Sequence, residues 1–505
     1  MSTEALLLRL HPDDDVAVAR VALAAGAQLG EAGLTARDAV PAGHKLALRA
    51  IAAGQDVRKY GQVIGQATRD IAAGEHVHVH NLDIGPLALA HTDGRDYRPA
   101  AAAEHQAQFQ GYVRADGRVG TRNYVLVLSS VNCSATVCKA IERHYGGSAL
   151  AAWPGVDGVV AVTHGTGCGM ASSGEGFELL RRTLRGYAVH PNVGGVLVIG
   201  LGCEVNQVQG LAQDLPLPAE RLRVLGIQDA GGTREAIQQG IEQVAELLAV
   251  AARDVRSTVS ARHLVVGLQC GGSDGYSGIS ANPALGAAVD LLVQQGGTAI
   301  LSETPEIYGA EHLLTARAAR PDVAERLRER IRWWEAYTAQ HGGDMNNNPS
   351  PGNKAGGITT ILEKSLGAVA KGGQTGLMEV LAYAERPSTP GLVFMDTPGY
   401  DPVSATGQVA GGANLICFTT GRGSTYGCKP TPSLKIATHT AIFQRMALDM
   451  DFNAGGVNDG DCSVAEAGRA LFELMLATAS GRATLSEEND LGHNEFVPWQ
   501  LGAVM

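Results

Sequence analysis

The chain has 505 residues, 45% of them hydrophobic and 18% charged, and a formal net charge of −11. This composition supports a sizeable core and excludes wholesale disorder, and an acidic chain without a basic tract argues against nucleic-acid partners and anionic membrane surfaces. The first residues lack the pattern of a signal peptide, no run reaches membrane-spanning length, and the eight cysteines form no short disulfide framework. We therefore expect a cytoplasmic protein of two to four domains.

The predicted elements fall into three parts. Up to about residue 85, short apolar runs alternate with turns such as PAGH, AAGQD and AAGEH, which indicates a small β-rich module. Residues 86–108 have the composition of a linker, and strand-like runs then alternate with helical patterns to about residue 253 and again from about 255. The fold class is α/β, with domains predicted at 1–98, 99–254 and 255–505, the last two built on mainly parallel sheets.

Four cysteines each end an apolar, strand-like run on a turn of small residues: Cys133, Cys168, Cys203 and Cys270. The carboxyl ends of parallel strands face one crevice, where ligands bind. Thiolates at such positions suit iron, iron–sulfur clusters or zinc. Four around one ion would close the site, whereas three would leave a position open for Lewis-acid chemistry. The alternative is that each cysteine is a small buried hydrophobe.

Further polar residues follow the same kind of run. His164 precedes Cys168 in THGTGCG and suits acid–base chemistry or metal binding, or else is a satisfied core histidine. Ser273 and Asp274 lie among glycines that allow a ligand close to the backbone, or form a tight surface turn. Glu303, with Glu306, can hold a metal or act as a base, or simply favour a helix N-terminus.

Two later segments combine cations with small polar groups. Asn353 and Lys354 occur in NNNPSPGNKAGG, and Thr420 and Arg422 in FTTGRG. Such groups suit a polyol that carries a carboxylate. Neither a Walker motif nor a dinucleotide fingerprint is present, so a nucleotide cofactor has little support.

The β-rich module carries its own polar cluster. His44 and Lys45 follow a glycine, and HVHVH places alternate histidines on one face of a strand. These residues form either a solvated polar face or a patch that covers a neighbour's site.

Many long blocks in the same order resemble one family, the altronate/galactarate dehydratases, which are sugar-acid hydro-lyases. GHKLAL and GEHVHVHN resemble its SAF-type domain, and VNCSA, THGTGCGM, GLGCE, LQCGGSD, LSETPEIYGAEHLL, MNNNPSPGNKAGG and CFTTGRG resemble its two larger domains. The resemblance implies an iron-dependent dehydration of D-altronate to 2-keto-3-deoxy-D-gluconate in hexuronate catabolism. Galactarate or another aldarate or aldonate is the alternative substrate, and Fe²⁺, a [4Fe–4S] cluster or substituting Mn²⁺ are the alternative metals.

The residues and the resemblance together give one set of predicted roles, for a small-molecule enzyme that forms a homo-oligomer, a dimer. The predicted catalytic residues are His164, Lys354, Asp274 and Glu303. The predicted substrate-binding residues are His44, Lys45, Ser273, Asn353, Thr420 and Arg422. The predicted metal ligands are Cys133, Cys168, Cys203 and Cys270. The hypothesis of a different class is a non-catalytic protein whose cysteines hold a closed metal site beside a ligand-binding SAF module.

Overall fold

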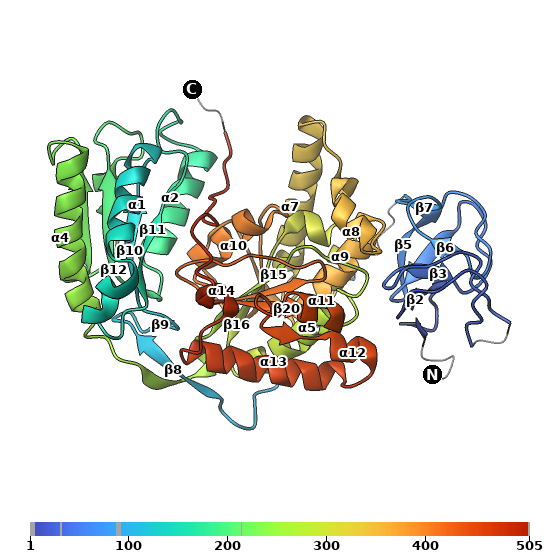
Figure 1. The fold of residues 1–505 in the computed structure, drawn as a ribbon. Coiled ribbons are helices and arrows are strands. Elements are labelled where there is room, and N and C mark those ends of the chain that lie inside the picture. The colour runs from blue at the N-terminus through green and yellow to red at the C-terminus, as the bar shows by residue number, and fades with distance from the viewer. Residues whose placement is uncertain (1–5, 31–32, 87–91, 214, 503–505) are drawn as a thin grey trace.

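A computed structural model describes residues 6–30, 33–86, 92–213 and 215–502. It has three parts: a β-rich N-terminal domain, a second domain around a four-stranded parallel sheet, and a C-terminal domain around a seven-stranded parallel sheet. The C-terminal domain lies in the middle, with the N-terminal domain against one side and the second domain against the other (Figure 1). The predicted fold class is confirmed.

The N-terminal domain consists of two small antiparallel sheets, ordered β1-β2-β3-β6 and β4-β5-β7. Its strands are β1 Leu7–Leu8, β2 Val16–Ala19, β3 Lys45–Ala47, β4 Asp56–Lys59, β5 Gln62–Ala67, β6 His76–Val77 and β7 Leu82–Asp83. Val57, Ile64 and Val77 are fully buried and belong to the same apolar cluster as Leu366 and Val369 of the C-terminal domain. The two domains therefore share part of one apolar core.

The second domain has a parallel sheet in the order β11-β10-β12-β13. Its strands are β10 Tyr124–Ser129, β11 Gly158–Val162, β12 Val193–Gly200 and β13 Leu222–Gly226, and its helices are α1 Ala135–His144, α2 Glu175–Ala188, α3 Val208–Ala212 and α4 Thr233–Ala251. Strands β10 and β12 are buried along their whole length, as expected when helices cover both faces of a sheet.

A small antiparallel sheet joins the second domain to the rest. It has the order β14-β8-β9, with β8 Gln108–Val113, β9 Val119–Gly120 and β14 Ser257–Ser260. Because β8 precedes the domain and β14 follows it, the chain enters and leaves the second domain at one place.

The sheet of the C-terminal domain has the order β17-β18-β16-β15-β19-β20-β21, and all its pairings are parallel. Its strands are β15 Val265–Cys270, β16 Thr298–Leu301, β17 Leu377–Leu381, β18 Gly391–Met395, β19 Leu415–Thr420, β20 Ser433–Ala437 and β21 Phe452–Asn453. Its helices are α5 Ala281–Gln294, α6 Glu311–Thr315, α7 Pro321–Gln340, α8 Pro351–Ala355, α9 Ile361–Val369, α10 Asp401–Ala410, α11 Thr440–Arg445, α12 Gly455–Asp459, α13 Val464–Ala479 and α14 Leu485–Glu488.

This strand order contains a topological switch point. From β15 the chain continues to its neighbour β16, whereas from β19 it continues to β20 on the opposite side. Ligands of open α/β sheets bind at such a point, outside the carboxyl ends of the strands. The crevice between the loops after β15 and β19 is therefore the first place to look for a site.

The C-terminal segment packs against two domains. The ring of Phe496 lies 4.7 Å from that of Tyr187 in the second domain, and Trp499 stacks on Trp334 of α7 with ring centroids 5.4 Å apart. The segment is the last coloured stretch of chain in Figure 1 and runs past α10 toward α2. Among the described helices, none has the length and hydropathy needed to cross a membrane.

Candidate active site at the carboxyl edge of the seven-stranded sheet

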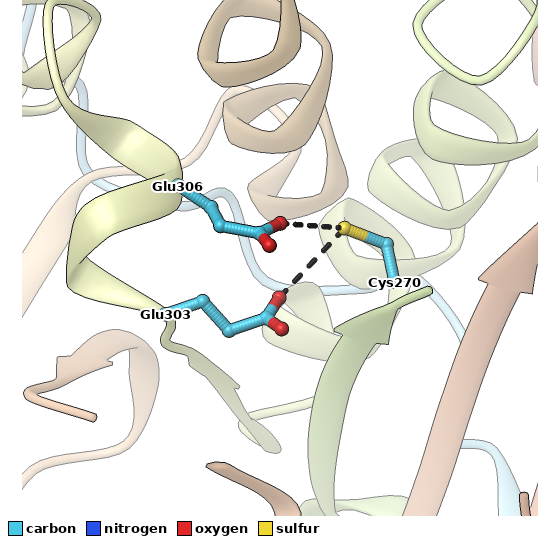
Figure 2. Close-up of side chains that lie close together, drawn as sticks. All are labelled: Cys270, Glu303 and Glu306. Carbon is cyan, nitrogen blue, oxygen red and sulfur yellow. Dashed lines mark hydrogen bonds between the residues drawn. The ribbon is translucent and has the colours of Figure 1, made fainter. Parts of the chain in front are cut away.

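A buried cluster of acidic groups lies at the carboxyl ends of β15 and β16. The thiol of Cys270, the last residue of β15, lies 3.7 Å from Glu303 Oε2 and 3.5 Å from Glu306 Oε2. Figure 2 shows both carboxylates pointing toward the sulfur. Glu303 has a left-handed backbone, with φ of 71°, just before the short 3₁₀ helix Thr304–Ile307. This strained conformation is rare for residues other than glycine and is found mostly at functional positions.

Two lysines face these acids. Lys371 Nζ donates to Cys270 Sγ and to Glu303 Oε2, both at 3.0 Å. Lys364 Nζ donates to Glu306 Oε1 at 2.6 Å. Both lysines are buried, and a buried ammonium is stable only when paired. The cluster is therefore a closed network of charges rather than a set of surface residues.

The acids outnumber the lysines, and their pKa values reflect this. Burial raises the pKa of Glu303 to about 8 although Lys371 lowers it, and burial raises the pKa of the Cys270 thiol to about 12. Asp401, at the start of α10, has its pKa raised to about 7 by burial and by the charge of Glu306. The protein alone thus keeps some of these groups protonated at neutral pH.

The cluster has the chemistry of a divalent metal site. Cys270, Glu303 and Glu306 offer ligand atoms that all lie within 4.8 Å of one another. Fully ionised, these three groups and Asp401 carry four negative charges against two from the lysines, a difference that a divalent cation would balance. Glu303 Oε1 is buried and has no hydrogen-bond partner in the part of the chain that the structure describes. A thiolate among carboxylates suits Fe²⁺ better than Mg²⁺.

A pocket of about 310 Å³ opens beside this cluster, between the N-terminal and C-terminal domains. Its volume falls in the range of small-molecule sites, roughly 300–1,000 Å³. Its wall includes His44 and Arg20 from the first domain and Asp274, Arg422 and His439 from the third. Asp274 follows β15 and Arg422 follows β19, so the pocket lies at the switch point of the sheet.

Asp274 is the buried acid of this pocket. Its Oδ1 accepts hydrogen bonds from the backbone nitrogen of Tyr276 and the hydroxyl of Ser277, both at 3.1 Å, and its Oδ2 lies 3.6 Å from His439 Nε2. Burial raises its pKa, and His439 opposes the rise. A Cβ atom at residue 421 would lie 2.1 Å from this carboxyl group, so Gly421 is required for its approach.

Arg422 lines the pocket, and Lys354 directly precedes Ala355 and Gly356, which also line it. Arg422 is exposed, Lys354 is half-buried, and neither side chain forms a hydrogen bond or ion pair within the described residues. The backbone carbonyl of Lys354 accepts a hydrogen bond from His78 of the first domain at 2.8 Å. These two cations are therefore available to an anionic ligand.

The first domain forms one wall of the pocket through its Gly43-His44-Lys45 turn. His44 Nε2 lies 3.2 Å from the carbonyl of Ala355, and its Nδ1 lies 3.1 Å from His76 Nε2. A Cβ atom at Gly275 would lie 1.9 Å from the carbonyl oxygen of Gly43, so the two backbones are in direct contact. His44 thus lines the pocket as part of a histidine cluster that closes on the third domain.

Lys45 has a different environment from the predicted one. It is fully buried and pairs with Glu363 at 2.8 Å, and Lys59 pairs with the other oxygen of the same carboxylate at 2.9 Å. This places Lys45 in the interface of the first and third domains, away from the pocket wall, where we expected it to bind substrate.

Three other predicted substrate ligands form hydrogen bonds within the loops or line a small cavity. Asn353 Nδ2 donates to the carbonyl of Ser273 at 2.9 Å, and the Oδ1 of the same Asn353 accepts from Ser350. The hydroxyl of Thr420 accepts from Gly423 N at 3.1 Å. Ser273 itself lines a very small cavity shared by Cys270 and Asp274. Asp274 lines both this cavity and the larger pocket.

The predicted four-thiol site is divided by the structure. Cys133, Cys168 and Cys203 follow β10, β11 and β12 of the four-stranded sheet, whereas Cys270 ends β15 of the other sheet. His164 also lies in the second domain, where its Nε2 is 3.1 Å from the carbonyl of Ser129 and burial lowers its pKa to about 4. The four cysteines therefore do not surround one ion, because they end strands of different sheets.

Two site residues were not among the predicted ones. Asp401 and His439 follow β18 and β20, so the strand-end pattern that identified Asp274 also applies to them. The runs GLVFMDTPGYD and SLKIATH contain that signal, since each passes from an apolar strand into a polar turn.

Sequence models of one enzyme family match the chain in three consecutive parts. The altronate/galactarate dehydratase SAF domain matches residues 5–85. The second domain of D-galactarate dehydratase/altronate hydrolase matches residues 111–252, and the C-terminal domain of D-galactarate/altronate dehydratase matches residues 261–504. The chain belongs to the altronate/galactarate dehydratase family.

Similarity to individual family members extends over nearly the whole chain. The altronate dehydratase of Escherichia coli (strain K12) is 38% identical, over 96% of this chain and 97% of that protein. The altronate dehydratase of Bacillus subtilis (strain 168) is 35% identical, over the same shares of the two chains. Galactarate dehydratase (L-threo-forming) of Escherichia coli (strain K12) is 38% identical, over 97% of this chain and 96% of that protein. The predicted resemblance is confirmed, and this family member is a lyase.

Proposed function

We propose that this protein is a metal-dependent hydro-lyase that converts D-altronate to 2-keto-3-deoxy-D-gluconate and water. The observation that carries this proposal is the pocket at the switch point, where free cations and a buried carboxyl group converge beside a cluster suited to a divalent metal. Two altronate dehydratases that match nearly the whole chain support the choice of substrate. The free cysteines fit a reducing compartment, so we infer that the reaction takes place in the cytoplasm.

Substrate binding follows from the free cations. The guanidinium of Arg422 matches the planar geometry of a carboxylate, which it can bind through two parallel hydrogen bonds. His44 forms the opposite wall of the pocket, where its two ring nitrogens are held by Ala355 and His76. The first domain closes this side of the pocket, which limits water at the reacting carbons.

Asp274 is our candidate for the base. In the reaction, the C2–H bond and the C3–O bond of the substrate break, and a double bond forms between C2 and C3. Asp274 takes the proton from C2, and its raised pKa suits a carboxylate that must accept a proton near neutral pH. His439 beside it stabilises the ionised form before the reaction.

The remaining steps need a proton donor and a positive charge near the carboxylate of the substrate. The half-buried ammonium of Lys354 can donate a proton to the leaving hydroxyl, which departs as water, and the enol then takes a proton at C3 as it becomes the ketone. Cys270, Glu303 and Glu306 would hold the metal, iron by preference. When bound, a metal supplies Lewis-acid stabilisation of developing negative charge. Glu303 is then a ligand rather than the acid–base residue that the sequence predicts.

One observation favours galactarate as a second candidate substrate. Arg20 also lines the pocket, on the wall formed by the first domain. An aldarate carries a carboxylate at both ends, and a pocket with two arginines can bind both. Galactarate dehydratase is among the proteins that match nearly the whole chain.

To test the proposal, the protein would be purified and loaded with Fe²⁺ without oxygen. Its turnover would then be measured on a panel of aldonates and aldarates. We expect 2-keto acid from altronate. Preference for galactarate, lost in Arg20→Ala while altronate turnover persists, would support the second candidate. Metal binding without turnover on any member of the panel would contradict both and favour a non-catalytic metal protein.

A further inference from the structure

Three cysteines of the second domain remain outside the proposed active site. Cys133, Cys168 and Cys203 are exposed, and none of their sulfur atoms has a hydrogen-bond partner within the described residues. They follow β10, β11 and β12, which are adjacent in the order β11-β10-β12. Free cysteine is among the most buried residue types. Three exposed thiols at one edge of one sheet therefore need an explanation.

Hydrogen bonds between their loops hold these cysteines near one another. Asn132, beside Cys133, donates its backbone N–H to the carbonyl of Thr166 at 2.9 Å. Asn206, three residues after Cys203, donates its backbone N–H to the carbonyl of Gly167 at 3.1 Å and its side-chain amide to that of Ser130 at 3.0 Å. Each pair of loops is thus bridged directly at residues close to the cysteines.

The loops leave little freedom for rearrangement. Gly167 has φ of 98°, and a Cβ atom there would lie 2.4 Å from the carbonyl oxygen of Ser130. The buried carboxylate of Glu204 accepts from the hydroxyl of Ser130 at 2.9 Å and from the backbone of Gly202 at 2.7 Å. That carboxylate is therefore occupied within the loops, and the thiols are the soft ligands left at this edge.

We propose that Cys133, Cys168 and Cys203 bind an iron–sulfur cluster of the [4Fe–4S] type, with one iron that has no protein ligand. A single ion, with metal–sulfur bonds of about 2.3 Å, would draw its three sulfurs within about 4 Å of one another. These cysteines do not form a group with all sulfur atoms within 4.8 Å among the described residues. A cluster fits a wider triangle because each thiolate binds a different iron. The three thiols release their protons to solvent as the iron–sulfur bonds form.

This inference is independent of the substrate and of the Cys270 site. Cys270 is buried against carboxylates and a lysine, which suits a divalent ion, whereas the three exposed cysteines offer thiolates alone. Thiolates alone are the ligand set of iron–sulfur clusters. The test therefore measures the cluster itself and needs no substrate.

The full-length protein would be purified without oxygen and reconstituted with sulfide and equal amounts of ferrous and ferric iron, because a [4Fe–4S]²⁺ cluster contains both oxidation states in equal number. We expect broad visible absorption, a Mössbauer spectrum of a cluster, and about four iron and four acid-labile sulfide per chain beyond the divalent ion. Cys133→Ser, Cys168→Ser and Cys203→Ser should each lose most of the sulfide and the absorption. Cys462→Ser, at a half-buried cysteine outside these loops, should retain them, as should Cys270→Ser.

Binding of one zinc or iron per chain at these cysteines, without sulfide, would overturn the proposal. Full sulfide content in all three serine variants would overturn it as well. If the serine variants do not fold, thiol alkylation of the wild-type protein replaces them. Reconstitution should then protect these three cysteines from alkylation, and equal labelling before and after it would overturn the proposal. Loss of turnover in Cys270→Ser with the cluster intact would separate this result from that of the proposed function.

Discussion

The carboxyl edges of the two parallel sheets look alike in sequence but differ in chemistry. Each edge has at least one apolar strand that leads into a cysteine on a turn of small residues. At the seven-stranded sheet, Cys270 is buried among carboxylates and lysines, and a pocket opens beside it. At the four-stranded sheet, the cysteines are exposed, and the nearby carboxylate of Glu204 is held within its own loops. The residues after each strand, and the domain that packs over them, decide the chemistry open to a strand-end cysteine.

The difference comes from the domains that cover each edge. The N-terminal domain packs on the edge of the seven-stranded sheet and supplies His44 to the pocket, so polar groups there are enclosed and their pKa values shift. At the four-stranded sheet the thiols themselves stay open to solvent. The enclosed edge of the seven-stranded sheet therefore suits acid–base chemistry, whereas the open edge of the four-stranded sheet suits a cofactor held at the surface.

The largest expected effect is loss of turnover on changing the buried acid of the pocket. Asp274→Asn keeps the shape and most hydrogen bonds of the side chain but cannot accept the C2 proton. We expect kcat to fall by about 10²–10⁴-fold, the range of general-base catalysis. Steady-state formation of 2-keto acid measures it.

Asp290→Asn is the matched control for that variant, because Asp290 accepts hydrogen bonds from the backbone of Gln374 and Thr375 and lies outside the pocket wall. Its kcat should stay within about threefold of wild type. Equal loss in both variants would show that Asp274 acts on the fold rather than on the substrate.

Removal of one carboxylate from the buried cluster should abolish divalent metal binding there. Glu306→Gln keeps the volume but removes a charge and a ligand, so we expect affinity for Fe²⁺ or Mn²⁺ to fall by at least about 100-fold. Metal titration followed by calorimetry measures this. Cys168→Ser should leave that affinity unchanged. A shared loss in both variants would mean that the two edges hold one metal centre.

Arg422→Lys also tests the pocket, with a smaller expected effect on catalysis. Lysine keeps the charge but lacks the planar fork, and a charge-assisted pair contributes roughly 1.5–3 kcal/mol. We expect kcat/KM for the sugar acid to fall about ten- to hundredfold with metal content unchanged. A lowered melting temperature with normal kinetic constants would instead make Arg422 a structural residue.

The smallest effect concerns acid stability of the second domain. Burial lowers the pKa of His164 to about 4, below its usual 6.5. Between these values the unfolded state binds the proton that the folded state excludes, so stability is complete above pH 6.5 and is lost as pH falls toward 4. At pH 5 the loss is up to about 2 kcal/mol.

His164→Asn should remove that dependence. Hydrogen exchange of the β10 amides at pH 7 and pH 5, corrected for intrinsic rates, measures it. Wild type should lose protection at pH 5 and the variant should lose less, while amides of β15 in the other sheet should respond equally in both proteins. An unchanged acid response in the variant would contradict the assignment to His164.

The order of the parts and the strand-end positions of the site could be predicted from the sequence, because apolar runs with glycine turns mark parallel strands locally. Asp274 and Arg422 were found in this way and converge at the switch point. The division of the cysteines between two sheets could not be predicted, because strand order depends on how distant segments pack. Cys133, Cys168 and Cys203 are equally spaced along the chain, whereas the interval from Cys203 to Cys270 is longer and contains a domain boundary.

Contacts between residues far apart in the chain could not be predicted from the sequence either. Lys371 contacts Cys270 across 101 positions, and the signal in its own neighbourhood, AVAKGG, is only a lysine near glycines. Lys45 follows His44 directly, and the two side chains nevertheless have separate environments: His44 lines the pocket and Lys45 is buried. Lys45 begins β3 whereas His44 lies in the turn before it, and which of the two side chains would meet another domain could not be read from the local sequence.

The shared carboxylate of Glu363 has a consequence for how the protein is made. Lys45 and Lys59 are synthesised well before their common partner, which follows more than 300 positions later. At roughly 5–20 residues per second, the ribosome needs about 15–60 s to supply it. Until then both ammonium groups must remain hydrated, so the N-terminal domain waits in an undocked form during synthesis. Its final attachment is a late event, completed only after most of the C-terminal domain has emerged.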